Sequence, residues 1–457
     1  MRSKQLTIQV WIDEIWADAA KLIIDDPALG HTGRIELDYE IQHAATYFEQ
    51  VGSAACSSML PVLPFAGYHC ERWWSWLDDI IPSGAGRRFW VENLGIGSRQ
   101  PPYKQDYELL LKGTIAPIGN LRIKESVPYD DSGNRLKTMT WSIEDVLTRH
   151  SDFLNHASSM GAVGGGATGA GGEAPKYLVR VTDKNEVWID PYQDDVLNLS
   201  RHYLVKFPRG EQTGDDKAIL KAEAGYYRFL DQIGMDTIQV EDMMFFDQNG
   251  KYSLWLPRFD VGIENGKLVK YGMESVYSVM NAEAGADLKH IDVIKALAPI
   301  LCGQENGMTM QELAEVWVER DLLNLCLGNA DNHGRNTSIL KIPGEPIKLA
   351  PLYDMAPMKA DPEGIRRKMI WDQPLENGWM IDWDEIALKL EDELSQMEYG
   401  PVSADGIIQR LESTAQKLIG LEDKLRGCDV PERIITFPSI GITTIEERLK
   451  RWELIDG

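Results

Sequence analysis

The stretch DNHGRNTSILKIPGEPIKLAPLYD, which runs from Asp331 to Asp354, decides how the rest of this chain is interpreted. It holds an aspartate, an asparagine five residues later (Asn336), a pattern of two short strands that turns at Pro343-Gly344, and a final aspartate. Phosphoryl transfer from Mg-ATP needs such groups, because one carboxylate orients the attacking hydroxyl while an amide oxygen and another carboxylate bind the metal. The stretch therefore predicts a phosphotransfer site.

The size and composition of the chain are those of a soluble globular protein. Its 457 residues predict two or three domains, and 43% hydrophobic with 26% charged residues is a typical balance. A net charge of −24 argues against direct nucleic-acid binding and against binding to anionic membranes. Acidic residues interrupt the N-terminal segment before any apolar region of a signal peptide, so we do not expect a secretory signal. The five scattered cysteines predict free thiols in a cytoplasmic protein.

Residues 1 to about 155 alternate short apolar strands with helical stretches. Strands are predicted over LTIQVWI (Leu6–Ile12) and around Ile115–Ile123, and a helix over Glu71–Ile81. This alternation predicts an N-terminal α/β subdomain.

A glycine-rich segment follows, with seven glycines in the twelve residues GAVGGGATGAGG from Gly161 to Gly172. One interpretation is a flexible interdomain linker. The other is a loop whose backbone approaches phosphates, with Gly169, Gly171 and Gly172 nearest the ligand, because glycine permits close backbone approach. The sequence that follows favours the phosphate loop.

That following sequence predicts a small antiparallel sheet. YLVRV (Tyr177–Val181) and EVWI (Glu186–Ile189) form a hairpin pattern, and the strand HYLVKF carries Lys206 near its end. A glycine-rich segment that leads into such a sheet, with one lysine displayed, is the layout of a kinase N-lobe.

A helix is predicted from Ala218 to Ile233, with Gly234 after its end. Glu223 lies on the otherwise apolar face of this helix, and a carboxylate turned toward a core needs a partner. Lys206 is the partner that we favour. The alternative is that Glu223 lies at the edge of the apolar stripe and reaches water.

Two further patterns lead to the Asp331 loop. MMFF and KYSLWL form a hairpin with Asn249-Gly250 at a type I′ turn, followed by a segment suited to link two lobes (Pro257, Arg258, Phe259 and Asp260). Thr309 and Glu312 form a capping box that opens a helix to about Leu327. We interpret His333 as a support of the loop and not as a metal ligand. A calcium loop is disfavoured because Ile342 stands where the twelfth ligand would be.

Taken together, these stretches resemble the HipA-like serine/threonine kinases, the toxin components of bacterial HipBA-type toxin–antitoxin systems. The resemblance lies in GNADNHGRNTSI and LAPLYDMAP, and it extends through HYLVKFP, EAGYYRFLDQIG and LPRFD. DDIIPSGAGRR and YELLLKGTIAPIGNLRI are similar to the N-terminal subdomain of the family. The resemblance implies an α+β fold with that N-terminal subdomain and a bilobal protein-kinase-like core whose C-lobe is mostly helical.

The resemblance also implies roles for individual residues. Asp331 is expected to be the catalytic aspartate, Lys206 to hold the α- and β-phosphates, and Asn336 and Asp354 to bind magnesium. Residues 257–260 are expected to flank the adenine of ATP. The family carries a loop serine whose autophosphorylation silences the enzyme, but Thr168 is the only hydroxyl between Gly161 and Lys176. Either Thr168 replaces that serine or the step is missing, and we favour Thr168.

The expected division is 1–155 for the N-terminal subdomain, 156–262 for the N-lobe and 263–457 for the C-lobe. The expected activity is ATP- and Mg²⁺-dependent phosphorylation of a Ser or Thr on a bacterial protein, with a separate HipB-like DNA-binding antitoxin as partner. The rival hypotheses are a noncatalytic, pseudokinase-like scaffold and a kinase that acts on a small molecule.

Overall fold

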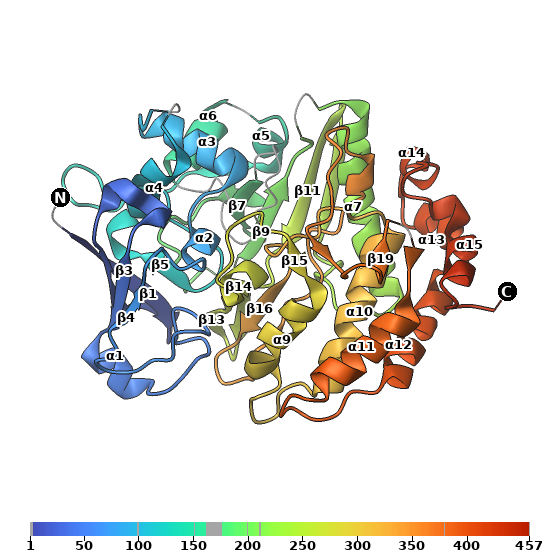
Figure 1. The fold of residues 1–457 in the computed structure, drawn as a ribbon. Helices are drawn as coiled ribbons and strands as arrows, with labels where there is room; N and C mark the ends of the chain where they lie inside the picture. The colour runs from blue at the N-terminus through green and yellow to red at the C-terminus, as the bar shows by residue number, and fades with distance from the viewer. Residues whose placement is uncertain are drawn as a thin grey trace. The chain divides into compact units, whose positions relative to one another are not determined.

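The computed structural model describes residues 3–97, 100–149, 151–160, 176–198, 200–209, 212–378 and 380–456. The chain forms two compact units and passes between them several times (Figure 1). The first unit holds residues 1–209, 241–284 and 338–345, and the second holds 210–240, 285–337 and 346–457. The three-part division at residues 155 and 262 stays a prediction.

The N-terminal part of the first unit is an antiparallel sheet with the strand order β4-β3-β2-β1-β5. Its aliphatic side chains form one buried core with a group of tryptophans that includes Trp73 and Trp90. The strands are β1 (Lys4–Ile12), β2 (Ile15–Ile24), β3 (Ile35–Tyr39), β4 (Tyr68–Cys70) and β5 (Leu121–Ile123). The helices of the first unit are α1 (Ile41–Thr46), α2 (Leu77–Ile80), α3 (Gly84–Asn93), α4 (Asp106–Lys112), α5 (Ile143–Leu147), α6 (Ser151–Ser159) and α8 (Val276–Val279).

The helix predicted over Glu71–Ile81 is wrong in its first half, because only Leu77–Ile80 is helical. The backbone N–H of Trp73 donates to the carbonyl of His31 over 3.0 Å, and that of Ser75 donates to the side chain of Asn281 over 3.0 Å. These amides are bonded to distant segments and so cannot form the i→i−4 bonds of a helix.

The second sheet of the first unit has the strand order β10-β11-β9-β7-β8-β6. Both predicted hairpins are confirmed, and the turn residues Asn249 and Gly250 have φ of 53° and 75°, the signature of the predicted type I′ turn. The strands are β6 (Thr140–Ser142), β7 (Lys176–Val181), β8 (Glu186–Trp188), β9 (Arg201–Lys206), β10 (Met244–Gln248) and β11 (Lys251–Pro257). Tyr203, Val205 and Trp255 are in its buried core.

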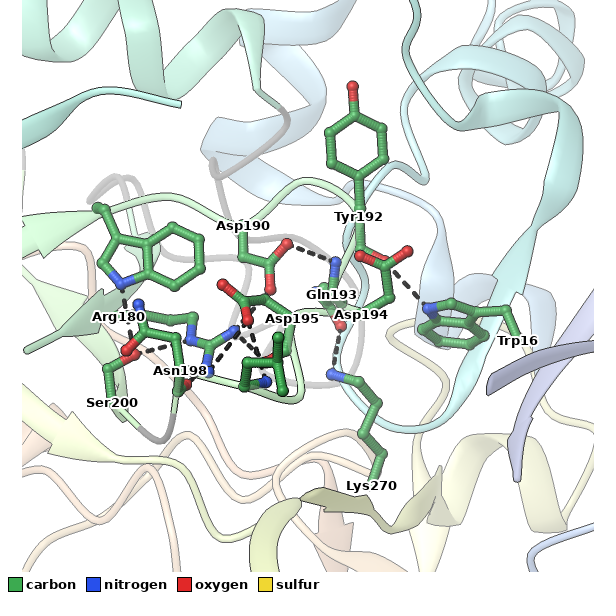
Figure 2. Close-up of polar contacts among 12 residues, drawn as sticks. Trp16, Arg180, Asp190, Tyr192, Gln193, Asp194, Asp195, Asn198, Ser200 and Lys270 are labelled. Carbon is green, nitrogen blue, oxygen red and sulfur yellow. Dashed lines mark hydrogen bonds and ion pairs between the residues drawn. The ribbon is translucent and has the colours of Figure 1, made fainter. Parts of the chain in front are cut away.

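The connection between β8 and β9 is fixed by Arg180 of β7, as Figure 2 shows. The Arg180 guanidinium donates to the Asp190 carboxylate over 2.7 Å, to the Ser200 hydroxyl over 2.9 Å and to the carbonyl of Asn198. Because Arg180 and Asp190 are both buried, their ion pair holds the start of the connection against β7.

The same connection also reaches the N-terminal sheet (Figure 2). The carbonyl of Tyr192 accepts hydrogen bonds from the Trp16 indole over 3.0 Å and from the Arg122 guanidinium over 2.8 Å. The Lys270 ammonium, which is fully buried, donates to the Gln193 side chain over 3.0 Å. Buried polar contacts therefore join both sheets of the first unit.

Two short ladders complete the first unit. β12 (Val261–Glu264) pairs with β13 (Lys267–Lys270), and β14 (Gly272–Ser275) pairs with β16 (Ser338–Lys341), the strand that follows the Asp331 loop.

The second unit is mostly helical (orange and red in Figure 1 for its C-terminal part). The central helix of this unit is α10 (Met310–Cys326). It is buried on nearly every side, as expected for a helix whose apolar residues are not confined to one stripe. That helix packs against α9 and α12, while α13 and α14 pack against α7. The helices are α7 (Gly214–Gln232), α9 (His290–Leu301), α10 (Met310–Cys326), α11 (Trp383–Leu394), α12 (Ala404–Leu418), α13 (Leu421–Gly427), α14 (Glu432–Ile435) and α15 (Ile445–Arg451).

The second unit also contains the short strands β15 (Leu288–Lys289), β17 (Lys348–Leu349), β18 (Met369–Ile370), β19 (Glu376–Asn377) and β20 (Met380–Ile381). All five cysteines are free thiols, as predicted. Over the described ranges, no helix combines the length and apolar character needed to cross a membrane.

Candidate active site

Helix α10 delivers the Asp331 loop. Its first turn is closed by the predicted capping box, with both reciprocal bonds between Thr309 and Glu312 present. After its end, Gly328 has φ of 69°, and a Cβ there would lie 2.8 Å from the side chain of Ile440. Only glycine fits at this close approach, so the chain turns at Gly328 from the helix into the loop.

The loop is closed by its own polar groups. The backbone carbonyl of Asp331 accepts from the N–H of His333 over 3.0 Å and from the side-chain amide of Asn336 over 2.7 Å. The N–H of Asp331 donates to the Asn329 side chain over 3.2 Å. The backbone of Asp331 is therefore fixed, while its side chain keeps 19% of its surface exposed and is accessible.

His333 supports the loop as predicted. Its Nδ1 accepts from the N–H of Arg335 over 3.2 Å, and its Nε2 lies 3.5 Å from the Asp331 carboxylate. Because Nδ1 accepts, the ring proton is on Nε2 and faces that carboxylate. The Tyr353 hydroxyl, next to Asp354, donates to the carbonyl of Arg335 over 2.6 Å and so joins the loop to the second aspartate.

The amide of Asn336 is used asymmetrically. Its nitrogen donates to Asp331, whereas its oxygen is buried and has no hydrogen-bond partner among the residues that the structure describes. A buried oxygen left in this state costs roughly 1–3 kcal/mol, and hard cations readily take amide oxygens as ligands. Asn336 therefore fits the predicted role of a metal ligand.

Asp354 has φ of 55°, a left-handed conformation that a residue with a Cβ keeps only when its surroundings hold it. In the described parts of the chain, no cluster of three or more His, Cys, Asp or Glu side chains suits a metal ion. Asn336 and Asp354 supply only one carboxylate, a donor set that fits magnesium, which keeps several of its water ligands.

Glu223 lies on the buried face of α7, as predicted. This helix begins four residues before the predicted start because Thr213 and Asp216 form a capping box. Glu223 is 4% exposed, and its carboxylate accepts from the Tyr227 hydroxyl over 3.1 Å.

The buried hydroxyl of Tyr227 is influenced by the charges of both Glu223 and Asp354. Burial raises the pKa of Tyr227 well above its usual range, and the charges of Glu223 and Asp354 raise it further, while the N–H of Met355 lowers it. The Tyr227 hydroxyl is therefore bonded to Glu223 and also feels the negative charge of Asp354.

The other predicted site residues belong to the first unit. Lys206 is the last residue of β9, is 6% exposed and stands opposite Leu254 in the ladder with β11. Pro257 ends β11 and precedes Arg258 and Phe259. The ion pair predicted between Lys206 and Glu223 joins residues of the two units and stays a prediction.

Asp260 fixes the end of the 257–260 segment. The carboxylate of Asp260 is buried, pairs with the Arg258 guanidinium over 2.5 Å and accepts from the N–H of Gly119 over 2.7 Å. The glycine-rich loop lies outside the described residues, and with it the predicted positions Thr168, Gly169, Gly171 and Gly172.

The sequence model of the HipA-like C-terminal domain matches residues 168–418, more than half of the chain. The matched range includes Lys206, Asp331, Asn336 and Asp354. The chain belongs to the HipA-like family.

The fold was also compared with those of solved structures. The HipA-like chain is similar to HipA in the Shewanella oneidensis MR-1 toxin–antitoxin complex of HipA, HipB and operator DNA. The TM-score is 0.66 at 14% identity, over 98% of this chain and 97% of that one. A lesser similarity is to the Helicobacter pylori proinflammatory kinase CtkA, with a TM-score of 0.37 at 13% identity over 63% of this chain and 91% of that one. A search of curated protein sequences gave no match. The predicted HipA-like α+β fold is confirmed by the similarity to HipA.

Sequence reasoning on this HipA-like chain missed Asn332, the neighbour of Asp331. The Asn332 side chain is buried, donates to the carbonyl of Met369 over 2.9 Å and accepts from the N–H of Lys368 over 3.2 Å. Its place in the loop was visible, but no spacing rule predicts partners so far along the chain. Tyr227 was also missed, although its position one turn after Glu223 was a usable signal.

Proposed function

We propose that this HipA-like protein is a serine/threonine protein kinase that transfers the γ-phosphoryl group of ATP to a protein hydroxyl. The observation that carries the proposal is the Asn336 amide. Its nitrogen is bound to the backbone of Asp331, and its buried oxygen has no partner within the described ranges of the chain. One loop thus presents a carboxylate and a free oxygen ligand, which is the pairing that phosphoryl transfer requires.

Each residue of the proposed site has a separate task. Asp331 orients the attacking hydroxyl and accepts its proton, while Asn336 and Asp354 are the residues that would hold magnesium. When bound, the ion would neutralise charge on the β- and γ-phosphates. Lys206 is assigned to the α- and β-phosphates, and Pro257, Arg258 and Phe259 to the adenine. Catalysis then comes mainly from positioning and charge neutralisation.

The proposal extends to partners and to physiological role. HipA of Shewanella oneidensis occurs in a toxin–antitoxin complex with HipB and operator DNA. We assign to this chain a HipB-like partner that makes the DNA contact, because a net charge of −24 disfavours direct contact with nucleic acid. The kinase would then be the toxin of such a system and would phosphorylate a bacterial protein in the cytoplasm.

The decisive experiment compares the wild type with Asp331→Asn in reactions with radiolabelled ATP, magnesium and host lysate, followed by phosphosite mapping. We expect the wild type to label Ser or Thr residues, and the mapping also tests Thr168. Asp331→Asn should lose transfer by at least about a hundredfold and keep the magnesium-dependent thermal shift with nucleotide. Asp405→Asn, an exposed aspartate at the start of α12, is the matched control.

Three outcomes would contradict the proposal. Undiminished phosphoryl transfer by Asp331→Asn would show that Asp331 is not the catalytic aspartate. A wild type that shows neither a thermal shift with nucleotide nor transfer would favour the noncatalytic scaffold. Labelling confined to small molecules of the lysate would favour the small-molecule kinase.

A further inference from the structure

The segment after Asp354 lacks residues that kinases commonly use for regulation. From Met355 to Leu394 the sequence contains no serine, threonine or tyrosine. In many protein kinases the segment after the metal-binding aspartate becomes ordered when a phosphorylated hydroxyl pairs with arginines. No hydroxyl is present for that purpose here, so an ordered segment needs another source of negative charge.

The segment is nevertheless bound into the second unit as regular structure. β18 (Met369–Ile370) pairs in parallel with β15 (Leu288–Lys289). The N–H of Leu288 donates to the carbonyl of Lys368 over 2.7 Å. Backbone hydrogen bonds therefore fix this part of the segment.

A buried carboxylate, Asp321 of α10, anchors the segment from inside. The Arg367 guanidinium donates to both oxygens of Asp321, over 2.8 and 3.0 Å, and the Trp371 indole donates to one of them over 2.9 Å. Asp321 is 1% exposed. Both ends of the short stretch 367–371 are thus bonded to one carboxylate.

The other side of Asp321 is occupied by His290. The Trp317 indole donates to Nδ1 of His290 over 2.9 Å, so the ring proton is on Nε2, which lies 3.4 Å from the Asp321 carboxylate. Burial alone would raise the pKa of Asp321, but the Arg367 guanidinium and the His290 ring outweigh burial and hold the pKa below its usual range. Asp321 is therefore a permanent negative charge.

Asn332 connects this anchored stretch to the catalytic loop. Its amide bonds the backbone of two successive residues, accepting from Lys368 and donating to Met369. Asn332 is 2% exposed and directly follows Asp331. Any movement of residues 368–369 must break these bonds or move the neighbour of Asp331.

We propose that Asp321 is a positioning residue: through Arg367 and Trp371 its carboxylate holds residues 367–371 against Asn332 and so fixes Asp331 without any phosphorylation of the segment. The inference rests on the proposed kinase function. The buried carboxylate supplies the charge that a phosphate supplies in other kinases. Asn332 is a second positioning residue in the same chain of contacts.

The chain offers a matched pair of variants in adjacent arginines. The side chain of Arg367 pairs with the buried Asp321 and is 10% exposed, whereas that of Arg366 is 67% exposed and pairs with the exposed Asp287. Arg367→Ala should lower kcat by about 10- to 100-fold, because small displacements of a catalytic group have effects of that size. Its KM for ATP should stay near that of the wild type, Arg367→Lys should recover part of the rate, and Arg366→Ala should behave as the wild type.

Two further measurements keep the test independent of folding defects. Asn332→Ala leaves the Asp321–Arg367 pair intact and should lower kcat without a comparable loss of thermal stability. Hydrogen exchange over residues 366–371 should become faster in Asp321→Asn than in the wild type. Phosphatase treatment of the wild type should not reduce its rate.

Wild-type kcat in both Arg367→Ala and Asn332→Ala would overturn the inference, and so would a wild type inactivated by phosphatase. If the wild type transfers no phosphoryl group at all, it is the proposed function that fails. In that case the role of Asp321 is tested separately. Unchanged hydrogen exchange at residues 366–371 in Asp321→Asn would contradict the inference that Asp321 holds this segment, whereas faster exchange would support it.

Discussion

At the scale of single residues, Asp354 has a left-handed backbone, and the buried side-chain oxygen of Asn336 lacks a hydrogen-bond partner in the described part of the chain; both are unfavourable in the protein alone. Each costs free energy that surrounding contacts must offset. Such residues gather at functional sites, and a bound cation would relieve the cost at Asn336 by replacing the missing hydrogen bond. Two residues of the proposed site thus carry an energetic cost in the protein alone.

Asp354→Ala is expected to remove magnesium-dependent nucleotide binding. The variant loses the only carboxylate of the proposed metal site, so the affinity for Mg-ATP should fall at least about tenfold. The measurement is a nucleotide thermal shift with and without magnesium. An unchanged affinity would contradict the metal role of Asp354, and Asp372→Asn is a control in the same unit.

Gly328→Ala is expected to destabilise the protein. The φ of 69° and the distance of 2.8 Å between a Cβ at this position and the Ile440 side chain both oppose a side chain. We expect the free energy of unfolding to fall by about 1–3 kcal/mol. Gly344→Ala is the matched control, because Gly344 has φ of 77° with open space around its position. Equal effects in a urea titration would mean that the contact with Ile440 is unimportant.

Lys270 makes stability depend on pH. Burial lowers the pKa of this ammonium to about 7, with Arg258 and Arg180 acting in the same direction and Asp190 and Asp260 opposing it. The unfolded lysine titrates near pH 10.4, so folding releases a proton between about pH 7 and about pH 10. The free energy of unfolding should therefore rise with pH there, by up to about 1.4 kcal/mol per unit.

The measurement is the pH dependence of urea unfolding in the wild type and in Lys270→Met. Below the folded pKa, Lys270 is protonated in both states, and its full desolvation penalty opposes folding. The free energy of unfolding of the wild type minus that of Lys270→Met should rise with pH between about pH 7 and about pH 10 and be constant below about pH 7. A difference independent of pH would contradict a lowered pKa for Lys270.

At the scale of elements, helix starts depend on side chains that precede the apolar pattern. The start of α10 was predicted from Thr309 and Glu312, whereas α7 was predicted to begin at Ala218 and begins at Gly214. Its capping box uses Asp216, a shorter side chain than the usual Glu or Gln, so the familiar pattern was absent. The apolar stripe alone marks where a helix is buried and not where it begins.

Thr309→Ala is expected to lower the free energy of unfolding by about 1 kcal/mol, because the backbone N–H of Glu312 in the first turn of α10 loses its side-chain acceptor. Urea unfolding measures the loss. Thr309→Ser keeps the hydroxyl and should be close to the wild type. If Thr309→Ser is as unstable as Thr309→Ala, the methyl group and not the cap is what matters.

At the scale of the whole molecule, the first unit is held together by buried charges that come from distant segments. Glu274 accepts from the Ser57 hydroxyl over 2.6 Å, from the N–H of Ser58 over 2.8 Å and from the Lys341 ammonium over 3.2 Å. Breaking a buried ion pair by removing one partner costs about 3–5 kcal/mol. The N-terminal residues are therefore part of the structure that holds β14 and β16.

Deleting residues 1–155 is expected to prevent cooperative folding of the remainder. Asp260 would lose the N–H of Gly119, and Glu274 would lose Ser57 and Ser58, so each of these buried carboxylates would lose part of its hydrogen bonding. Near-ultraviolet circular dichroism and a thermal melt measure the outcome. A cooperative melt with a nucleotide-dependent shift would show that the N-terminal residues are a separable module.

What the sequence determined by itself was local. Asn249-Gly250 specified its turn, Thr309 and Glu312 specified a helix start, and the spacing of Asp331 and Asn336 specified a loop, because each feature is decided by residues a few positions apart. These features were enough to place the chain among HipA-like proteins.

Only the tertiary structure decided the distant pairings. Arg367 meets Asp321 across 46 residues, and Gly119 meets Asp260 across 141 residues. Periodicity tells which face of an element is buried, but a buried charge takes whichever partner the folded chain brings to it, and many sequence positions offer the same chemistry. Packing decides which of these positions becomes the partner. The contacts of Asp321 with Arg367 and Trp371 could therefore be identified only from the folded structure.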